Sequence, residues 1–224
     1  MFRSMCMWAL TVLGGFVAMA PATRAAALDV KQVVRQVQAR YDATHDFSAD
    51  VTQEMTVASL GKTTTEHGNV VFKKPGKMRW ELGEGASQVI VADGTNLWLY
   101  QPKEHQVIKA RFDAAFRSNT PISFLTGVGR IADDFDVSLD GEASAGAFLS
   151  LQLVPRNDAG DVGRLRLTVA RDTFDIVAAE IHDPLGNVSR MQFEHIKRNT
   201  GVPDERFEFH VPPGTDVVPA PTMQ

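Results

Sequence analysis

The chain has 224 residues, a formal net charge of −4 at pH 7 and one cysteine. This length favours one domain with a substantial core. A mildly acidic chain without a basic run is a poor candidate for binding nucleic acid or an anionic membrane surface, so we expect no nucleic-acid partner.

The N-terminus has the layout of a secretory signal peptide. Arg3 precedes an apolar run, and small residues lead to three alanines that end at Ala27. We expect cleavage there, which divides the chain into a leader, 1–27, and a single domain, 28–224. The alternative is an uncleaved N-terminal anchor, for which the apolar run is short. Because Cys6 lies in the leader, the mature protein is expected to have no disulfide and no lipid anchor. Export places it in an oxidising compartment, where we expect it to be soluble.

A helix is predicted at the start of the mature chain, over about 28–42. Val30, Val33, Val37 and Tyr41 recur at helical spacing, and polar residues fill the other positions. Valine is a mediocre helix former because its branched side chain restricts rotamers in a helix. This helix therefore needs a surface on which to pack.

After this helix the apolar residues alternate with a period of two. Turn sequences such as 74–76 and 93–94 separate the alternating runs, which favours antiparallel strands joined by hairpins. The pattern predicts a barrel or a strongly curved sheet and argues against a parallel α/β fold. The predicted strands are 47–57, 66–74, 77–82, 88–92, 97–101, 106–109, 135–139, 148–154, 164–171, 175–181, 188–196 and 206–211. The end of the chain, 218–224, is predicted to be a loose tail.

One segment, 111–130, interrupts this alternation. Thr120 followed by proline suits the start of a helix, and Ile122, Phe124 and Leu125 give it an apolar character. We predict one or two short apolar helices inserted between strands.

Several predicted strands have one apolar face. Met78, Trp80 and Leu82, for example, alternate with Lys77, Arg79 and Glu81. Such strands direct one face to water and the other to an apolar interior. That interior is either an apolar cavity too wide for its side chains to fill, or an ordinary filled core. Alternation alone does not distinguish the two.

The sequence contains no recognisable catalytic or metal-binding motif. No two of the six histidines stand at metal-ligand spacing, and no nucleophile elbow or phosphate-binding glycine loop is present. Asp133, Asp134 and Asp136 lack the glycine and distal glutamate of a calcium loop. We therefore expect no enzyme activity, metal or cofactor. A hydrolase with a carboxylate pair from distant strands is the open alternative.

An ordered set of motifs resembles the outer-membrane lipoprotein carrier family, LolA. Residues 68–80 fit the strand-pair pattern G-x-x-x-x-K-[KR]-P-G-x-x-R-W. A V-x-D-G hairpin at 91–94 and L-W-x-Y-x-P at 97–102 follow in the order of the family. Thr120-Pro121 and the segment 207–217 also match, so the resemblance covers nearly all of the mature chain.

The resemblance implies a mainly β (α+β) fold, a half-open antiparallel β-barrel around an apolar cavity, lidded by an N-terminal helix and inserted short helices. It implies a soluble, monomeric periplasmic chaperone. Such a chaperone takes acylated lipoproteins from an inner-membrane ABC-type lipoprotein-releasing complex, shields their acyl chains and hands them to an outer-membrane lipoprotein receptor. The alternative is a periplasmic lipid- or lipoprotein-sensing regulatory module on the same scaffold.

The candidate lipid-binding residues lie on the apolar faces of the predicted strands and helices. They are Val33, Val37, Met78, Trp80, Leu82, Val89, Val91, Leu97, Leu99, Ile122, Phe124 and Leu125. A bulge within 88–100 would exchange the faces and turn Trp98 and Tyr100 inward instead.

Lys74 is the candidate lid latch, at a position where many family members have arginine. In those members the arginine binds backbone carbonyls of the helical lid, and we expect Lys74 to contact the helix over 120–127. Lysine donates as a point charge without the planar fork of arginine. The alternative is a solvated turn residue.

Overall fold

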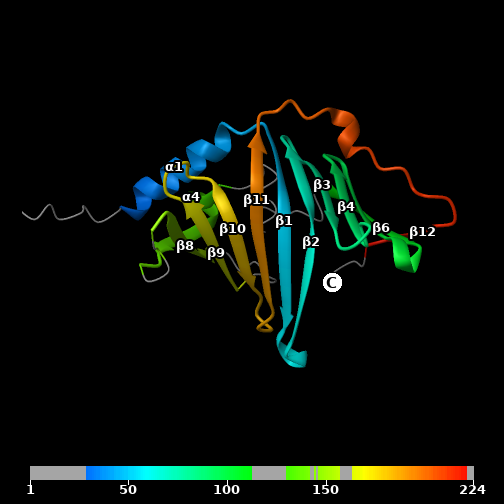
Figure 1. Cartoon of the computed structure of the whole chain (residues 1–224), viewed down its shortest axis with the longest axis horizontal. Helices are drawn as coiled ribbons and strands as arrows, with labels where there is room; N and C mark the ends of the chain where they lie inside the picture. Colours follow the sequence, from blue (N-terminus) through cyan, green and yellow to red (C-terminus); the bar gives the residue numbers. More distant parts are fainter. Residues whose placement is uncertain (1–28, 113–129, 142–143, 145, 157–162, 221–224) are drawn as a thin grey trace, which may run out of the picture.

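The computed structural model describes residues 29–112, 130–141, 144, 146–156 and 163–220, which form one curved sheet with helices at its edge and on one face (Figure 1). The expected leader, 1–27, lies outside the described residues. So do Ile122, Phe124 and Leu125 of the predicted inserted helices.

Twelve strands and two α-helices make up the described fold. The strands are β1 (Asp46–Val57), β2 (Lys62–Lys73), β3 (Lys77–Leu82), β4 (Gln88–Asp93), β5 (Asn96–Gln101), β6 (Gln106–Arg111), β7 (Phe135–Leu139), β8 (Phe148–Pro155), β9 (Arg164–Ala170), β10 (Ile176–His182), β11 (Val188–Arg198) and β12 (Asp216–Pro219). The helices are α1 (Val30–Asp42) and α4 (Ile131–Asp134), with 3-10 turns η1 (Ala58–Leu60), η2 (Pro102–Glu104) and η3 (Asp204–Phe207).

The strands form one sheet in the order β12-β6-β5-β4-β3-β2-β1-β11-β10-β9-β8-β7, with β12 and β7 at its two ends. The half-open, barrel-like architecture expected from the sequence is confirmed. Two predictions near the C-terminus are wrong. Residues 206–211 form no strand, since η3 and an irregular segment occupy them, and Val218 and Pro219 belong to β12 instead of a loose tail. β12 pairs with β6 in parallel, a departure from the predicted antiparallel meander.

α1 packs as its sequence predicts, and Asp29 caps its start. The carboxylate of Asp29 accepts a hydrogen bond from the Lys31 amide at 3.0 Å, which caps the first turn. Val33, Val34 and Val37 are its buried residues. Because these side chains share a cluster with apolar residues of the sheet, tertiary packing supplies the support that a valine-rich helix lacks by itself.

The sheet has two faces, which we name by their relation to α1. The inner face carries the residues that cluster with the valines of α1, for example Phe72, Met78 and Trp80. The outer face carries their chain neighbours. Directly paired residues lie on the same face, so the register of the strands assigns each side chain to one of the two.

The C-terminal segment covers the outer face of the β2–β6 region. Phe207 in η3 is 1% exposed, and η3 lies beside β3 and β4. The ring of Phe209 lies 5.9 Å from that of Trp98 and 6.0 Å from that of Tyr100. β12 then joins the sheet edge, so this segment returns to the sheet after crossing it.

Two lysines of the β2–β3 hairpin bind this segment. The Nζ atoms of Lys73 and Lys77 lie 2.5 and 2.8 Å from the carboxylate of Asp204. Hydrogen bonds from these two lysines lower the pKa of Asp204 to about 2. The C-terminal segment is thus attached to the sheet by charge as well as by aromatic packing.

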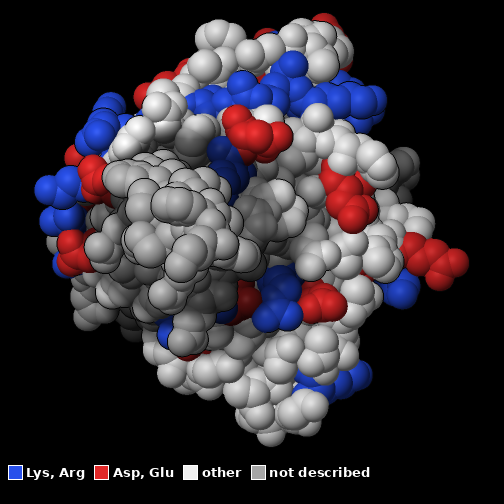
Figure 2. Space-filling view, turned by 60° about the vertical axis from the view of Figure 1, so that its left-hand side comes forward, with Lys and Arg blue, Asp and Glu red and all other residues white. Residues whose placement is uncertain are grey.

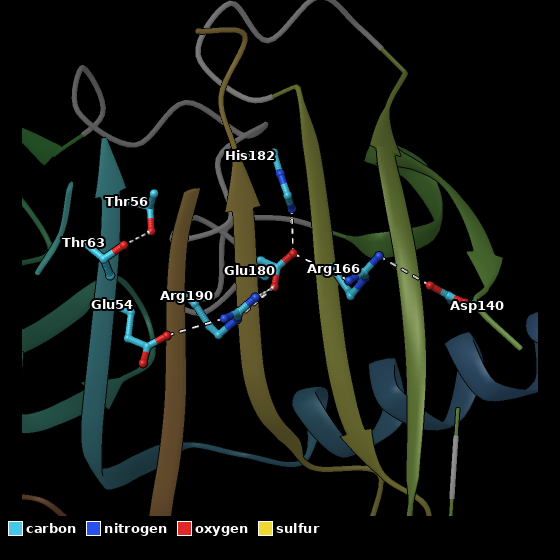
Figure 3. Close-up of polar contacts among 8 residues, drawn as sticks. All are labelled: Glu54, Thr56, Thr63, Asp140, Arg166, Glu180, His182 and Arg190. Carbon is cyan, nitrogen blue, oxygen red and sulfur yellow. Dashed lines mark hydrogen bonds and ion pairs between the residues drawn. The ribbon is translucent and has the colours of Figure 1, made fainter. Parts of the chain in front are cut away.

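A ladder of alternating charges crosses the outer face on the other side of the sheet (Figure 3). Glu180 on β10 accepts from Arg190 Nε and Nη2 at 2.9 and 2.6 Å, and lies 2.6 Å from His182 Nε2. Arg190 reaches Glu54 on β1 at 3.4 Å. Arg166 on β9 lies 3.6 Å from Glu180 and continues the ladder to Asp140. Opposite charges on neighbouring strands stabilise the pairing.

Gly68 is required where β2 closely approaches its neighbour β3 at Glu81. A Cβ atom at this position would lie 1.8 Å from the carbonyl oxygen of Glu81. We predict that Gly68→Ala costs about 1–3 kcal/mol of unfolding free energy, because the backbone must move apart. Gly141→Ala is the control, since nothing lies within 4 Å of a Cβ there. Equal urea midpoints for the two variants would contradict this close approach.

Glu180 makes stability depend on pH. Burial raises the pKa of its carboxyl, but the bonds from Arg190 and His182 outweigh this and hold the pKa below its ordinary value. Its stabilisation is therefore present above the unfolded pKa, roughly 4.3, and is lost as pH falls through the folded pKa. We predict that Glu180→Gln costs about 1–2 kcal/mol near pH 7 in urea unfolding, with the gap closing in acid.

The matched control for this prediction is Glu194→Gln, an exposed carboxylate on β11. It should change the unfolding free energy little at either pH. If the difference in unfolding free energy between the native protein and Glu180→Gln is the same at neutral and acid pH, the charge of Glu180 is not what stabilises the fold.

Candidate functional site

Five of the expected cavity residues lie together on the inner face. Val33, Val37, Met78, Trp80 and Leu82 are each at most 3% exposed and belong to one buried cluster. Helix α1 and strand β3 thus contribute to the same apolar surface.

The expected positions of Val89 and Val91 require a correction. Trp80 pairs with Ile90, and Arg79 with Val91, so it is Ile90 and Ala92 that share the inner face with Trp80. Val89 and Val91 are buried on the outer face instead. The sequence does not show which residues of β4 lie on the inner face, because residues 89–92 are all apolar and the turn before β4 does not determine the orientation of the strand.

β5 has the orientation that was expected. Leu97 pairs with Ala92 and Leu99 with Ile90, so both leucines lie on the inner face, and Leu97 packs against the cluster. Trp98 and Tyr100 lie on the outer face, where Phe209 contacts their rings.

A pocket lies beneath the C-terminal end of α1, with a volume of about 70 Å³. Its apolar wall consists of Val37, Phe47, Phe72, Phe174, Ile176 and Phe193. Arg40, Lys74 and Arg198, with Asp46 and Asp175, add polar groups. Elements distant in sequence, α1 and strands β1, β2, β10 and β11, meet at this point.

Lys74 bonds to the last turn of α1. Its Nζ donates to the carbonyl of Tyr41 at 2.5 Å and lies 3.4 Å from the centroid of the Tyr41 ring. A cation at a helix C-terminus is favoured by the helix dipole, and the ring face adds a cation–π contact. Burial lowers the pKa of Lys74, which the nearby charge of Asp42 partly opposes. The expected partner, the helix over 120–127, lies outside the described residues.

Further polar contacts hold the same end of α1, and sequence reasoning missed them. Arg40 Nε lies 2.9 Å from the carboxylate of Asp175, at the start of β10. The side chain of Asn199 donates to the Ala43 carbonyl at 3.0 Å and accepts from the His45 amide at 2.7 Å. Asp175 and Asn199 lie 135 and 156 residues from their partners at the end of α1, so no local sequence pattern predicts these contacts.

Asp46 fixes the loop that carries Asn199. Its buried carboxylate accepts from Thr200 N and Oγ1 at 2.8 and 3.1 Å, Gly201 N at 3.0 Å and Val202 N at 3.4 Å. Burial disfavours the charged form, but these donors outweigh it and lower the pKa of Asp46. The carboxylate is therefore fully occupied by this loop.

The site has the chemistry of a binding surface. The described residues include no group of three or more His, Cys, Asp or Glu side chains that could hold a metal ion. None of the described helices has the length and apolar character that a bilayer-spanning segment requires. What the arrangement offers is a large apolar face, closed at one corner by a few polar contacts to α1.

The profile of the family described as "Outer membrane lipoprotein carrier protein LolA" matches residues 42–210. The chain belongs to this family. Curated relatives named "Outer-membrane lipoprotein carrier protein" include one from Methylobacillus flagellatus, 31% identical over 189 residues, which are 83% of this chain and 88% of the relative. Another, from Leptothrix cholodnii, is 34% identical over 170 residues, 76% of this chain and 77% of the relative.

A solved structure shares the fold. An "uncharacterized conserved protein" from Thermus thermophilus superposes with a TM-score of 0.53 at 15% identity, over 84% of this chain and 98% of that one. At this identity the likeness concerns the fold alone.

The LolA-like motif over 68–80 now has a physical explanation. Gly68 permits the close approach of β2 to β3, and Trp80 belongs to the inner-face cluster. Lys73 binds the C-terminal segment on the outer face, and Lys74, the next residue, binds α1 on the inner side. These two consecutive lysines therefore bind segments on opposite faces of the sheet: Lys73 binds the C-terminal segment and Lys74 binds α1.

We predict that Lys74→Met loosens the end of α1. Losing a charge-assisted hydrogen bond should raise the population in which this end is open about tenfold. Amide hydrogen exchange in the last two turns of α1 should quicken, and the empty protein should bind more of a hydrophobic dye.

The charge-matched control is Lys103→Met, an exposed lysine in η2, and Lys74→Arg should restore normal exchange. Unchanged exchange and dye binding in Lys74→Met would mean that Lys74 is only a turn residue and that apolar packing closes this corner.

Proposed function

We propose that this protein is a soluble periplasmic carrier of acylated lipoproteins. It takes them from an inner-membrane ABC-type releasing complex, covers their acyl chains with its inner face, and hands them to an outer-membrane receptor. Family membership and the names of the relatives support the carrier role. The observation that carries the proposal is the apolar inner-face cluster, to which α1 contributes its buried valines, together with the contacts of Lys74, Arg40 and Asn199 that hold the C-terminal end of α1.

The energetics of acyl chains account for this design. Each methylene of a chain exposed to water costs about 0.8 kcal/mol, so a lipoprotein anchor needs a continuous apolar cover during transfer. The apolar pocket beneath α1, about 70 Å³, is far below the roughly 300–1,000 Å³ of ordinary ligand sites. Acyl chains therefore enter by displacing α1 from the inner face and taking over its contacts. Closure of the helix then favours release.

No catalytic step is needed for this cycle. Binding and release follow from the difference in apolar area buried by α1 and by the cargo, and from the few polar contacts that favour the closed state. Membership of a carrier family favours such a binding role over turnover.

The experiment fixes α1 to the sheet. The only cysteine of the chain, Cys6, lies in the expected leader, so Arg40→Cys with Asp175→Cys gives a mature protein with a single reactive pair. These side chains lie 2.9 Å apart in the native protein, within reach of a short cleavable bismaleimide. We predict that the cross-linked protein releases no labelled lipoprotein from inner-membrane vesicles, and that cleaving the linker restores release.

The uncross-linked double variant and each single variant are the controls, and they should release lipoprotein. Equal release by the cross-linked form would contradict the movement of α1. Absence of release by the native protein itself, under conditions in which a known carrier works, would contradict the carrier function.

A further inference from the structure

A β-bulge in β11 turns Arg198 toward the pocket. The pairing of β1 with β11 shifts between Ser48 and Asp50, where β11 contains one additional residue, and His195 adopts a φ of 50°. Beyond this bulge Arg198 pairs with Phe47, a residue of the pocket wall. Bulges re-aim side chains and are frequent beside functional sites.

The cations at this pocket outnumber the carboxylates available to them. Arg40 and Arg198 contact the same oxygen, Oδ1, of Asp175. Lys74 donates its hydrogen bond to the neutral carbonyl of Tyr41, and it forms no ion pair within the part of the chain that the structure describes. Asp46, the other carboxylate of the pocket, is occupied by the loop that follows β11.

Besides burial, the pKa of Arg198 reflects a second positive charge beside it. Burial, and then the like charge of Arg40, lower the pKa of Arg198. Burial likewise lowers the pKa of Lys74, although Asp42 opposes this. In Figure 2, a band of Lys and Arg side chains crosses the upper part of the view, and Asp and Glu side chains lie directly beneath it.

We propose that this pocket binds an amphiphile with one alkyl chain and an anionic head, its head beside Arg40 and Arg198, which share one oxygen of Asp175, and its first methylenes against the aromatic wall. A carboxylate or phosphate matches the paired donors of guanidinium groups, and Phe47, Phe174 and Phe193 suit an alkyl chain. The acyl chains of a lipoprotein are joined by ester and amide groups, which carry no charge. The cationic rim therefore points to a ligand other than the lipoprotein cargo.

Two sources present this chemistry, a free fatty acid and a single-chain phospholipid. The test titrates the mature protein calorimetrically with decanoate, decyl phosphate and 1-decanol, which share one chain length. We expect at least one of the two anions to bind about tenfold more tightly than the alcohol, the value of one charge-assisted bond. The tighter anion identifies the source.

Arg198→Gln should remove most of this preference. Lys197→Gln should retain it, because this variant makes the same change of charge on the neighbouring, exposed residue of β11. If Arg198→Gln fails to fold, the native protein still decides the matter through its ratio of anion to alcohol, and Arg40→Gln supplies the second variant.

The proposal is overturned if 1-decanol binds the native protein as tightly as both anions, or if Lys197→Gln and Arg198→Gln weaken anion binding equally. Neither outcome affects the lipoprotein-release assay, so failure here is distinguishable from failure of the carrier function.

Discussion

The constraint on which this structure depends is that the inner face of the sheet is apolar and that, in the β2–β6 region, the outer face is apolar as well, so both must be covered. In the β2–β6 region, side chains of both parities are buried, Met78 and Trp80 on the inner face and Val91 and Val107 on the outer face. The two covers differ in how they are attached. The C-terminal segment is held by aromatic packing, by the Lys73 and Lys77 ion pairs and by strand pairing along β12. At its C-terminal end, α1 is held by hydrogen bonds and the ion pair of Arg40. Such a difference suits a molecule in which one cover is permanent and the other moves.

The β2–β3 hairpin connects these covers. Its consecutive lysines point to opposite faces, because side chains alternate along a strand, so Lys73 reaches the C-terminal segment while Lys74 reaches α1. Lys74 forms one hydrogen bond to Tyr41 and a cation–π contact to its ring, without the bidentate fork that an arginine would offer. A closed state of modest stability is useful to a carrier, since acyl chains must compete with it successfully and yet be released. In the proposed cycle, the partly buried amine of Lys74 is therefore a contact that favours the closed state.

Much of this fold is predictable from the sequence, and the exceptions have physical causes. Alternation in Met78, Trp80 and Leu82 identified the inner face correctly, because charged neighbours marked the opposite parity. The same reasoning failed for Val89 and Val91, where both parities are apolar and the C-terminal segment, distant in sequence, covers the outer face. The roles of Asp175 and Asn199 depend on contacts that fold together distant parts of the chain, and the bulge that redirects Arg198 leaves no local signal. The contacts that hold the end of α1 are therefore the part of the site that the sequence predicts least well.

The most direct measurement of the central claim is to map where an acyl chain lies on the protein. A lipoprotein whose acyl chain carries a diazirine is loaded onto the mature carrier, irradiated, and the labelled residues are identified by mass spectrometry. We expect labels on inner-face residues such as Val33, Met78 and Leu97, which belong to the inner-face cluster or pack against it in the empty protein. Labels confined to the outer face, at Val91 or Val107 beneath the C-terminal segment or along the charged ladder of Glu180, would contradict the central claim.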